Sequence, residues 1–448
     1  MLERIAKFNH STRYRPIKPL LHVKPKPTEV RDDGSDRTVF NRRRDVVNQV
    51  LSPTTSNFGF DGAGSLLFST RRSPPLAVRS AEPLADDEYG EMEWNRAALL
   101  ELSDSVRGNL EREKNGGPDV GKLSKFLEAA LRDEEQSGQP ALDFGTIEYA
   151  RLDKLLADLL HFAETIKSIL NLSPPPDKLP LQFRIDVLNA KSLRRLWRRR
   201  FRERYFMMDQ HRCALLVEGG RLKDVSFNSS LSYDLGKWHT KVSGPISELE
   251  GNLQFDPGHW WLNITCAERD GIVTTSAETP TRGRYGITVL PLLTGREEMI
   301  RSNTYKYIRE GRCADMHIPL ISQVGREIRV LRGYKLKSIL APQAGVRYDG
   351  LFTIRQYGCK LDDKTNIYRL ELTLERVADQ KKSQDEIKNI PSPSQLDDWN
   401  LFEKLEGDKI RLLQGETSYL EWKLRRQAEQ IDREEWRRAR LFRASFSH

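Results

Sequence analysis

Arginines at helical spacing are the residues in this chain whose possible chemistry is plainest. The stretch from Ala190 to Gly220 places arginines three and four residues apart, at Arg194, Arg195, Arg198, Arg199 and Arg202. Apolar side chains take up the opposite face of the same expected helix, at Leu193, Leu196, Trp197, Phe201 and Tyr205. Guanidinium groups bind phosphate oxygens, so the basic face predicts contact with a polyanion. A merely solvated charged face and a nuclear import signal are the two alternatives.

Metal and catalytic chemistry find little support in the residue pattern. The four cysteines lie far apart, without a Cys-x-x-Cys pair or a histidine at ligand spacing, at Cys213, Cys266, Cys313 and Cys359. We expect four reduced thiols rather than a zinc site. His259 and His317 are isolated histidines with no evident Asp, Cys or Ser partner, so no catalytic set can be proposed from them. The expectation is therefore no catalytic residue, no metal, no cofactor and no small-molecule substrate.

Composition suggests one globular domain with long polar or helical flanks. Of the 448 residues, 38% are hydrophobic and 31% are charged, which is a low apolar share for a fully packed chain of this length. Lysines and arginines outnumber acids by 73 to 64, a net charge of +9 that favours a polyanionic partner. No apolar run approaches about 18 residues. We expect a soluble intracellular protein with no membrane partner.

The chain on either side of the basic helix divides into an expected tail, expected helices and expected linkers. Residues 1–90 are predicted to be a disordered basic and proline-rich tail, in which Asn41 to Val47 is a second candidate import signal. Leucines at three- and four-residue spacing predict helices over 91–172, and the prolines of 173–180 mark a linker. The remaining expected segments are a basic amphipathic helix over 181–218, a polar linker over 378–395 and amphipathic helices over 396–448.

Short alternating runs between these helices predict a β domain. Glycines and prolines punctuate the stretch from about Leu222 to Val377, as is typical of a closed or nearly closed β-barrel. In "YRLELTLER" the leucines Leu370, Leu372 and Leu374 alternate with polar residues, which predicts a half-buried strand. Trp260 and Trp261 fit a buried core pair, with base stacking as the alternative.

The order of several motifs in this region resembles the SRA-YDG domain, a member of the PUA-like barrels. The motifs are "EGGRLKDVSF", "DGIVTTSAETPTRGRYGITVL", "GREIRVLRG" and "GVRYDGLFTI", followed by "YRLELTLERV". The resemblance covers 219–377. It implies an α+β protein, with a PUA-like SRA-YDG β-barrel flanked by α-helical segments and a disordered N-terminus. The chain is similar to the fungal members of the family that lack RING, PHD or SET domains.

The resemblance implies binding of duplex DNA in chromatin, with methylated cytosine flipped into a pocket between aromatic walls. "GRYGITVL" matches one pocket element through Tyr285, whereas in "TGREEM" Arg296 takes the place of an aromatic wall and Met299 that of the acidic acceptor. The acids Glu297 and Glu298 stand beside them, and Tyr305 or Tyr307 would be the surviving platform. Three outcomes stay open, which are methylcytosine flipping, methylation-indifferent DNA binding and a barrel used for protein contacts.

The Tyr-Asp-Gly itself is expected to be structural. Asp349 and Gly350 have the chemistry of a turn that opens the next strand, with Tyr348 bracing the barrel beneath the pocket. Arg347, just outside this motif, is the further candidate for phosphate contact.

These expectations describe a nuclear, non-enzymatic, chromatin-associated protein. Its partners would be double-stranded DNA, with methylated DNA as one open alternative, and chromatin proteins bound by the helical flanks. The competing hypothesis is a chromatin protein-interaction scaffold whose barrel no longer binds methylated DNA.

Overall fold

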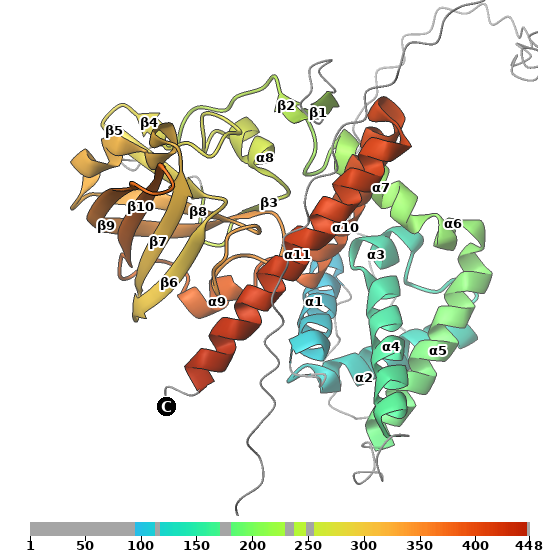
Figure 1. The fold of residues 1–448 in the computed structure, drawn as a ribbon. Helices are drawn as coiled ribbons and strands as arrows, with labels where there is room; N and C mark the ends of the chain where they lie inside the picture. The colour runs from blue at the N-terminus through green and yellow to red at the C-terminus, as the bar shows by residue number, and fades with distance from the viewer. Residues whose placement is uncertain (1–94, 113–116, 171–180, 229–236, 248–254, 446–448) are drawn as a thin grey trace, which may run out of the picture. The chain divides into compact units, whose positions relative to one another are not determined.

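The computed structural model of the chain describes residues 95–112, 117–170, 181–228, 237–247 and 255–445 (Figure 1). The expected tail over 1–90 and the proline-rich linker over 173–180 lie outside the described residues. Within them the chain combines helices with a multi-stranded sheet, which confirms the α+β class.

Most of the described helices fall before or after the strands. Those before the strands are α1 (Arg96–Arg112), α2 (Val120–Gln136), α3 (Phe144–Tyr149), α4 (Leu152–Leu170), α5 (Leu181–Phe201), α6 (Glu203–Phe206) and α7 (Met208–Glu218), whereas α8 (Ile264–Arg269) lies among the strands. Those after the strands are α9 (Gln384–Lys388), α10 (Pro393–Gln414) and α11 (Glu416–Ser445). Two short 3-10 helices, η1 (Cys313–Met316) and η2 (Ile318–Gln323), interrupt the strands. No helix in the described ranges is both long and apolar enough to cross a bilayer.

Helices α1, α2, α4 and α5 pack side by side around one apolar cluster (Figure 1). Phe126, Leu155 and Trp197 are fully buried in it. The leucine stripes seen in the sequence are the faces that meet there, because residues three and four apart share one side of a helix. Arg107 of α1 then joins this bundle to α10 through Asp397, with Nη1 2.8 Å from the carboxylate oxygen.

The segment 181–218 is three helices rather than the single amphipathic helix that the sequence suggested. The chain breaks at Arg202, whose φ of 49° is left-handed and cannot continue a helix. Helices α6 and α7 then follow, meeting at Met207. The basic face of α5 therefore ends at this break.

The strands form a two-stranded and an eight-stranded sheet. The strands are β1 (Val225–Asn228), β2 (Lys237–Thr240), β3 (Trp260–Trp261), β4 (Thr281–Gly283), β5 (Gly286–Leu292), β6 (Arg296–Arg301), β7 (Thr304–Gly311), β8 (Glu327–Gly333), β9 (Val346–Asp362) and β10 (Ile367–Arg376). The large sheet runs β4-β5-β8-β9-β10-β7-β6, with β3 paired to β9. All its pairings are antiparallel except that of β5 with β8.

The expected closed barrel is not observed. Among the described strands, β4 and β6 end the pairing order at opposite edges and do not pair with each other. The outer edge of β6 has only an isolated parallel bridge, from Arg296 to Lys337. The strand β4 is three residues long and offers too few backbone groups to continue the ladder. The sheet is therefore curved but open.

Apolar and polar side chains alternate along the strands, and the apolar ones form the core of the sheet domain. Leu370, Leu372 and Leu374 of β10 are fully buried on one face, which confirms the pattern in the sequence. Trp260 and Trp261 are also buried, and the indole of Trp260 donates to the carbonyl of Ala344 at 2.7 Å. They are a core pair and not a stacking platform.

The segment expected as a polar linker, 378–395, is packed structure. It contains α9 and the start of α10, and the side-chain amide of Gln380 pairs with the backbone of Leu351 in both directions, at 2.8 and 2.9 Å. Gln380 therefore fixes the chain after β10 against β9.

Gly350 gives a first prediction for stability. Its φ is 102°, and an added Cβ would lie 2.2 Å from the Gln380 side-chain oxygen, which is already held by Leu351. We expect Gly350→Ala to lower the free energy of unfolding by about 1–3 kcal/mol, because an L side chain is strained at this φ. Thermal melting followed by circular dichroism measures it. Gly358→Ala in the same strand is the control, since nothing lies within 3.8 Å of its added Cβ, and equal melting of the two variants would contradict the prediction.

Candidate nucleic-acid interface

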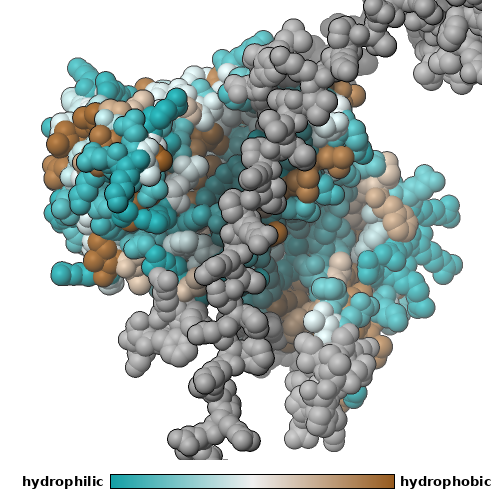
Figure 2. All heavy atoms as spheres, in the orientation of Figure 1, coloured by the Kyte–Doolittle hydropathy of each residue, from teal (hydrophilic) through white to brown (hydrophobic). Residues whose placement is uncertain are grey.

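Exposed arginines line α5 and the residue that follows it. Arg195, Arg198 and Arg199 lie on α5, Arg202 lies at the break after it, and we call these four exposed residues the arginine stripe. The side chains of Arg195, Arg199 and Arg202 make no hydrogen bond or ion pair within the described part of the chain. The guanidinium of Arg198 lies 5.8 Å from the ring centre of Tyr205 and 5.7 Å from that of Phe206. Figure 2 shows a mainly hydrophilic surface over α5 and α6.

The bundle fixes the orientation of this stripe. Leu193 and Trp197 on the opposite face of α5 are fully buried against α2 and α4, and the indole of Trp197 donates to Glu134 at 3.0 Å. Arg194 is half-buried at the border and its Nε has no partner among the described residues. Arg200 pairs with Glu134. The helix therefore cannot roll the stripe inward without unburying Trp197, whose transfer to water is unfavourable.

The two tyrosines expected as the base platform belong to the core. Tyr305 and Tyr307 of β7 are 3% and 2% exposed and pack with the apolar residues of β8, β9 and β10. The hydroxyl of Tyr307 donates to the carbonyl of Thr294 at 3.1 Å, and burial raises the pKa of both tyrosines. Neither ring presents a free face to a flipped base, because strand alternation turns both side chains into the sheet's buried side.

The acids beside them are engaged in ion pairs. Glu297 is buried and holds the guanidinium of Arg332 with two hydrogen bonds, at 2.6 and 2.9 Å. Glu298 pairs with Arg440 of α11. Arg296 lies 3.9 Å from Glu310, and its Nε has no partner within the described residues. None of these three side chains is positioned as the wall or the acceptor that the sequence suggested.

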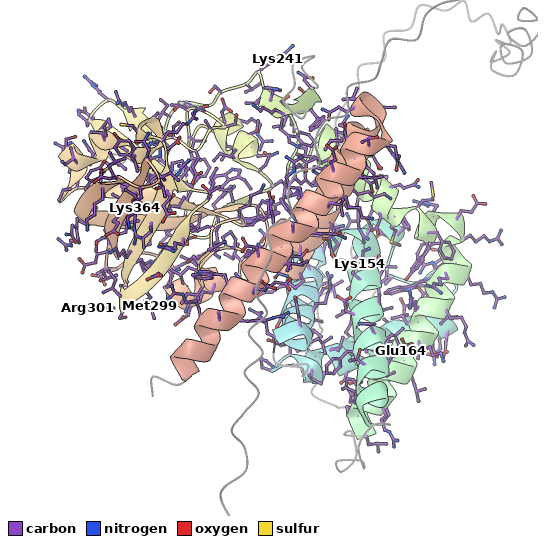
Figure 3. The ribbon with its side chains drawn as sticks, in the orientation of Figure 1. Lys154, Glu164, Lys241, Met299, Arg301 and Lys364 are labelled. Atoms are coloured by element: carbon purple, nitrogen blue, oxygen red, sulfur yellow. The ribbon has the colours of Figure 1, made fainter. Side chains whose placement is uncertain are left out.

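Two exposed residues of the same region face away from the core. Tyr285, at the tip of the turn between β4 and β5, is 55% exposed. Met299 is 58% exposed and lies with Arg301 near the free end of β6, as the labels in Figure 3 show. The side chain in the place of the expected acceptor is therefore a solvent-facing thioether.

Arg347 requires a correction, because it is fully buried and cannot reach a phosphate. Its guanidinium binds Asp349 at 2.6 and 2.9 Å and donates to the carbonyls of Ile387 and Ile390 at 3.0 and 2.8 Å. All these acceptors are protein atoms, and a buried guanidinium gives up such partners only at high cost. Arg347 ties β9 to the segment around α9.

Asp349 and Gly350 also differ from expectation, since they lie inside β9 and not in a turn. The pairing register of β8 and β9 shifts here, with Val330 opposite Gly350 and Leu331 opposite Tyr348. Asp349 is thus the extra residue of a β-bulge, and a bulge re-aims its side chain. Tyr348, Asp349 and Gly350 are all buried.

The bulge directs Asp349 into a fully buried ion network made of Glu297, Arg332, Arg347 and Asp349. Arg332 joins the two acids, donating from Nη1 to Asp349 at 2.6 Å, and its guanidinium lies 4.9 Å from the ring centre of Phe352. Burial alone would raise the pKa of Asp349, but the guanidiniums of Arg347 and Arg332 outweigh it and hold that pKa below its usual range. The network stabilises the contacts among β6, β8 and β9.

Sequence reasoning missed Arg332, the centre of this network. The signal was present, because an arginine between Leu331 and Gly333 in an otherwise apolar strand needs a carboxylate partner if both faces of the strand are buried. Sequence spacing did not reveal that the partner was Glu297, 35 residues away.

Comparisons with known proteins give local likenesses only. No family model matches the chain, and no curated protein matches it. The SRA domain of SUVH5 in complex with hemimethylated CG DNA is 16% identical with a TM-score of 0.24, covering 32% of this chain and 99% of that one. SUVH6 of Arabidopsis thaliana in complex with SAM is 13% identical with a TM-score of 0.27, covering 66% and 43%. A modification-dependent restriction endonuclease, TagI, is 14% identical with a TM-score of 0.25, covering 34% and 57%. Likenesses at this level say nothing of what this chain binds.

The described residues contain no group of three or more histidine, cysteine or acidic side chains that could hold a metal ion. Burial raises the pKa of the Cys266 thiol to about 11, so this cysteine is a poor nucleophile at neutral pH. Of the phosphate-contact candidates, the four residues of the arginine stripe remain exposed.

Proposed function

We propose that this protein is a non-catalytic chromatin protein of the nucleus that binds duplex DNA through the arginine stripe of α5. The observation that carries the proposal is a row of four exposed arginines, three on α5 and one at the break that ends it, of which the side chains of Arg195, Arg199 and Arg202 have no partner in the described structure. Planar guanidiniums match phosphate oxygens, and a rigid helix offers them with little loss of conformational freedom.

We further propose that binding does not depend on cytosine methylation. Flipping a base out of the duplex costs unstacking free energy. Stacking of the flipped base on an aromatic side chain of the pocket offsets this cost by about 1–3 kcal/mol for each base. Tyr305 and Tyr307 are committed to the core, and Glu297 to Arg332. These side chains could contact a methylcytosine only by breaking their present contacts, and the free energy lost in doing so would cancel the gain from binding the base.

The test is fluorescence anisotropy of the full chain with matched unmethylated, hemimethylated and fully methylated duplexes over a range of salt. We expect equal affinities for the three duplexes and a log–log salt slope of about −3 to −4, since four arginines would release about that many counterions. A clear preference for a methylated duplex would contradict methylation indifference. A slope near zero would contradict the phosphate contacts.

A protein-interaction scaffold is the second candidate, favoured by the apolar residues beside the stripe. Phe206 is exposed at the end of α6, Met207 is exposed between α6 and α7, and Leu215 is exposed on α7. Exposed aromatic and methionine side chains are enriched where proteins meet. Absence of duplex binding at low salt would favour this alternative.

A further inference from the structure

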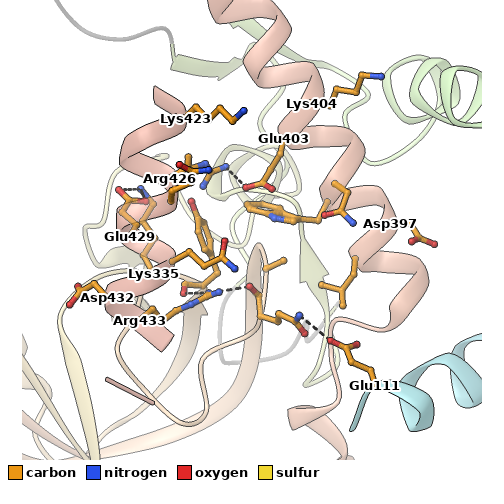
Figure 4. Close-up of a pocket in the computed structure, with 18 of the residues that line it drawn as sticks. Glu111, Lys335, Asp397, Glu403, Lys404, Lys423, Arg426, Glu429, Asp432 and Arg433 are labelled. Atoms are coloured by element: carbon orange, nitrogen blue, oxygen red, sulfur yellow. Dashed lines mark hydrogen bonds and ion pairs between the residues drawn. The ribbon is translucent and has the colours of Figure 1, made fainter. Parts of the chain in front are cut away.

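A large cleft adjoins the C-terminal helices, remote in sequence from the arginine stripe. Its volume is about 1460 Å³, and its walls come from α1, α4, α10, α11 and the segment after β8 (Figure 4). A second cavity of about 310 Å³ lies next to it. The two cavities share Tyr334, Trp399, Trp422 and Arg426, so these side chains separate one space from the other.

Three aromatic rings surround one cation at this boundary. The guanidinium carbon of Arg426 is 5.2 Å from the ring centre of Tyr334, 5.3 Å from that of Trp399 and 5.6 Å from that of Trp422. Such distances allow a cation to interact with all three π faces. We call Tyr334, Trp399 and Trp422 the aromatic cage.

Carboxylates complete the cage. Arg426 Nη2 is 3.1 Å from Glu403 and 3.2 Å from Glu406, and Glu406 also accepts from the indole of Trp238 at 3.1 Å. Figure 4 shows Glu403 and Arg426 facing each other across the cleft. Burial raises the pKa of both acids, that of Glu406 to about 7, so a positively charged occupant is what favours their charged forms.

Arg426 matches this environment imperfectly. Its Nε is buried and finds no hydrogen-bond acceptor among the described residues. Burial also lowers its pKa to about 10, so the charged guanidinium is held there at a cost. The cage offers several π faces but few hydrogen-bond acceptors. A methylated ammonium has fewer N–H groups than the guanidinium of Arg426, or none, and therefore needs fewer acceptors.

We propose that the aromatic cage is a binding site for a methylated ammonium group, the side chain of a methylated lysine on a partner peptide, and that Arg426 is its resident competitor. The peptide backbone would lie in the larger cleft, where Lys404, Lys423 and Glu111 line the walls (Figure 4). The ligand would enter as the Arg426 side chain swings out. This proposal does not depend on DNA binding.

The position of Arg426 favours such an exchange. Its side chain lines both cavities, so a rotation of its own torsions moves it into open space. The nearby contacts of α11 with the sheet domain are polar and partly exposed, with Lys335 bound to Glu429 at 2.9 Å and Lys337 to Asp432 at 2.7 Å. Such pairs are weak in water and allow local adjustment.

The test is a titration of the full chain and of Arg426→Ala with tetramethylammonium chloride, followed by tryptophan fluorescence. Sodium chloride at equal ionic strength is the reference. We expect saturable binding that is at least about tenfold tighter in the variant, because removal of an internal competitor raises the fraction of open cage. A peptide with trimethyl-lysine should bind more tightly than its unmethylated form.

A matched control is Arg438→Ala on the same helix, which removes an equal charge from an exposed side chain that lines neither cavity and should respond like the wild type. If folded Arg426→Ala responds to tetramethylammonium no more than to sodium, the proposal is wrong. If that variant does not fold, the indole N–H resonances of Trp399 and Trp422 in the wild type decide. Saturable shifts with tetramethylammonium support the site, and their absence overturns it.

Discussion

Replacing Asp349 with asparagine should lower the free energy of unfolding by about 3–5 kcal/mol, the largest effect on stability that we expect from a single change. The asparagine keeps the shape of the side chain but removes its charge. Arg332 and Arg347 would then share a fully buried space with one carboxylate, Glu297, which binds Arg332 and not Arg347. An uncompensated guanidinium without water around it is the source of the loss.

Chemical denaturation followed by circular dichroism measures the effect. Glu375→Gln is the control. It removes the same charge, but Glu375 pairs with Arg355 on the exposed side of the sheet. That variant should lose less than about 1 kcal/mol, as surface pairs do. Equal stability of Asp349→Asn and the wild type would show that the buried network contributes little.

The same network predicts how stability depends on pH. Because the folded state lowers the pKa of Asp349, the carboxylate contributes stability that is fully present above its unfolded pKa of about 3.9 and is lost as pH falls through the folded pKa. The difference in unfolding free energy between wild type and Asp349→Asn should be constant from about pH 5 upward and should shrink below about pH 4. A difference that grew on acidification would contradict this assignment.

Neutralising two arginines of the stripe, in Arg198→Gln/Arg199→Gln, should give the largest loss of DNA affinity. Each phosphate contact contributes about 0.9 to the salt slope, so the slope should fall by about 2. Glutamine retains a helix propensity close to that of arginine, so α5 should remain intact. The weakening should be uniform across sequences and methylation states, because phosphate contacts carry no base information.

The matched control removes two exposed lysines elsewhere, in Lys360→Gln/Lys364→Gln, with Lys360 near the end of β9 and Lys364 in the turn that follows (Figure 3 labels Lys364). It changes the net charge equally, so it separates a local contact from a general electrostatic effect. Anisotropy titrations at several salt concentrations measure both variants. Equal losses in the two would argue against a specific interface on α5, and a change confined to methylated duplexes would contradict phosphate contact.

Periodic features could be predicted from the sequence, and side-chain partners could not. The leucines of β10 and the apolar face of α5 were readable because burial repeats with the period of the element. The prediction that Arg347 contacts phosphate was wrong, because it rested on the position of Arg347 just outside the Tyr-Asp-Gly motif. Its guanidinium donates to the carbonyls of Ile387 and Ile390, some 40 residues later in the chain. Local spacing contains no information on such contacts.

The bulge in β9 could not be predicted from the sequence for the same reason. Asp349 and Gly350 are common turn residues, and only the register of β8 against β9 shows that they form a bulge within a strand. Similarly, the aromatic cage assembles Tyr334, Trp399 and Trp422 from three separate elements. Each could be predicted as an apolar residue, but their meeting around Arg426 depends on tertiary packing.

Hydrogen–deuterium exchange of the full chain with and without an unmethylated duplex tests the central claim most directly. If the arginine stripe binds the DNA backbone, peptides that cover residues 194–206 should gain protection on addition of the duplex, while those that cover 294–311, around the expected base pocket, should remain unchanged. Protection confined to 294–311, with 194–206 unaffected, would contradict the account and place the interface on the sheet domain.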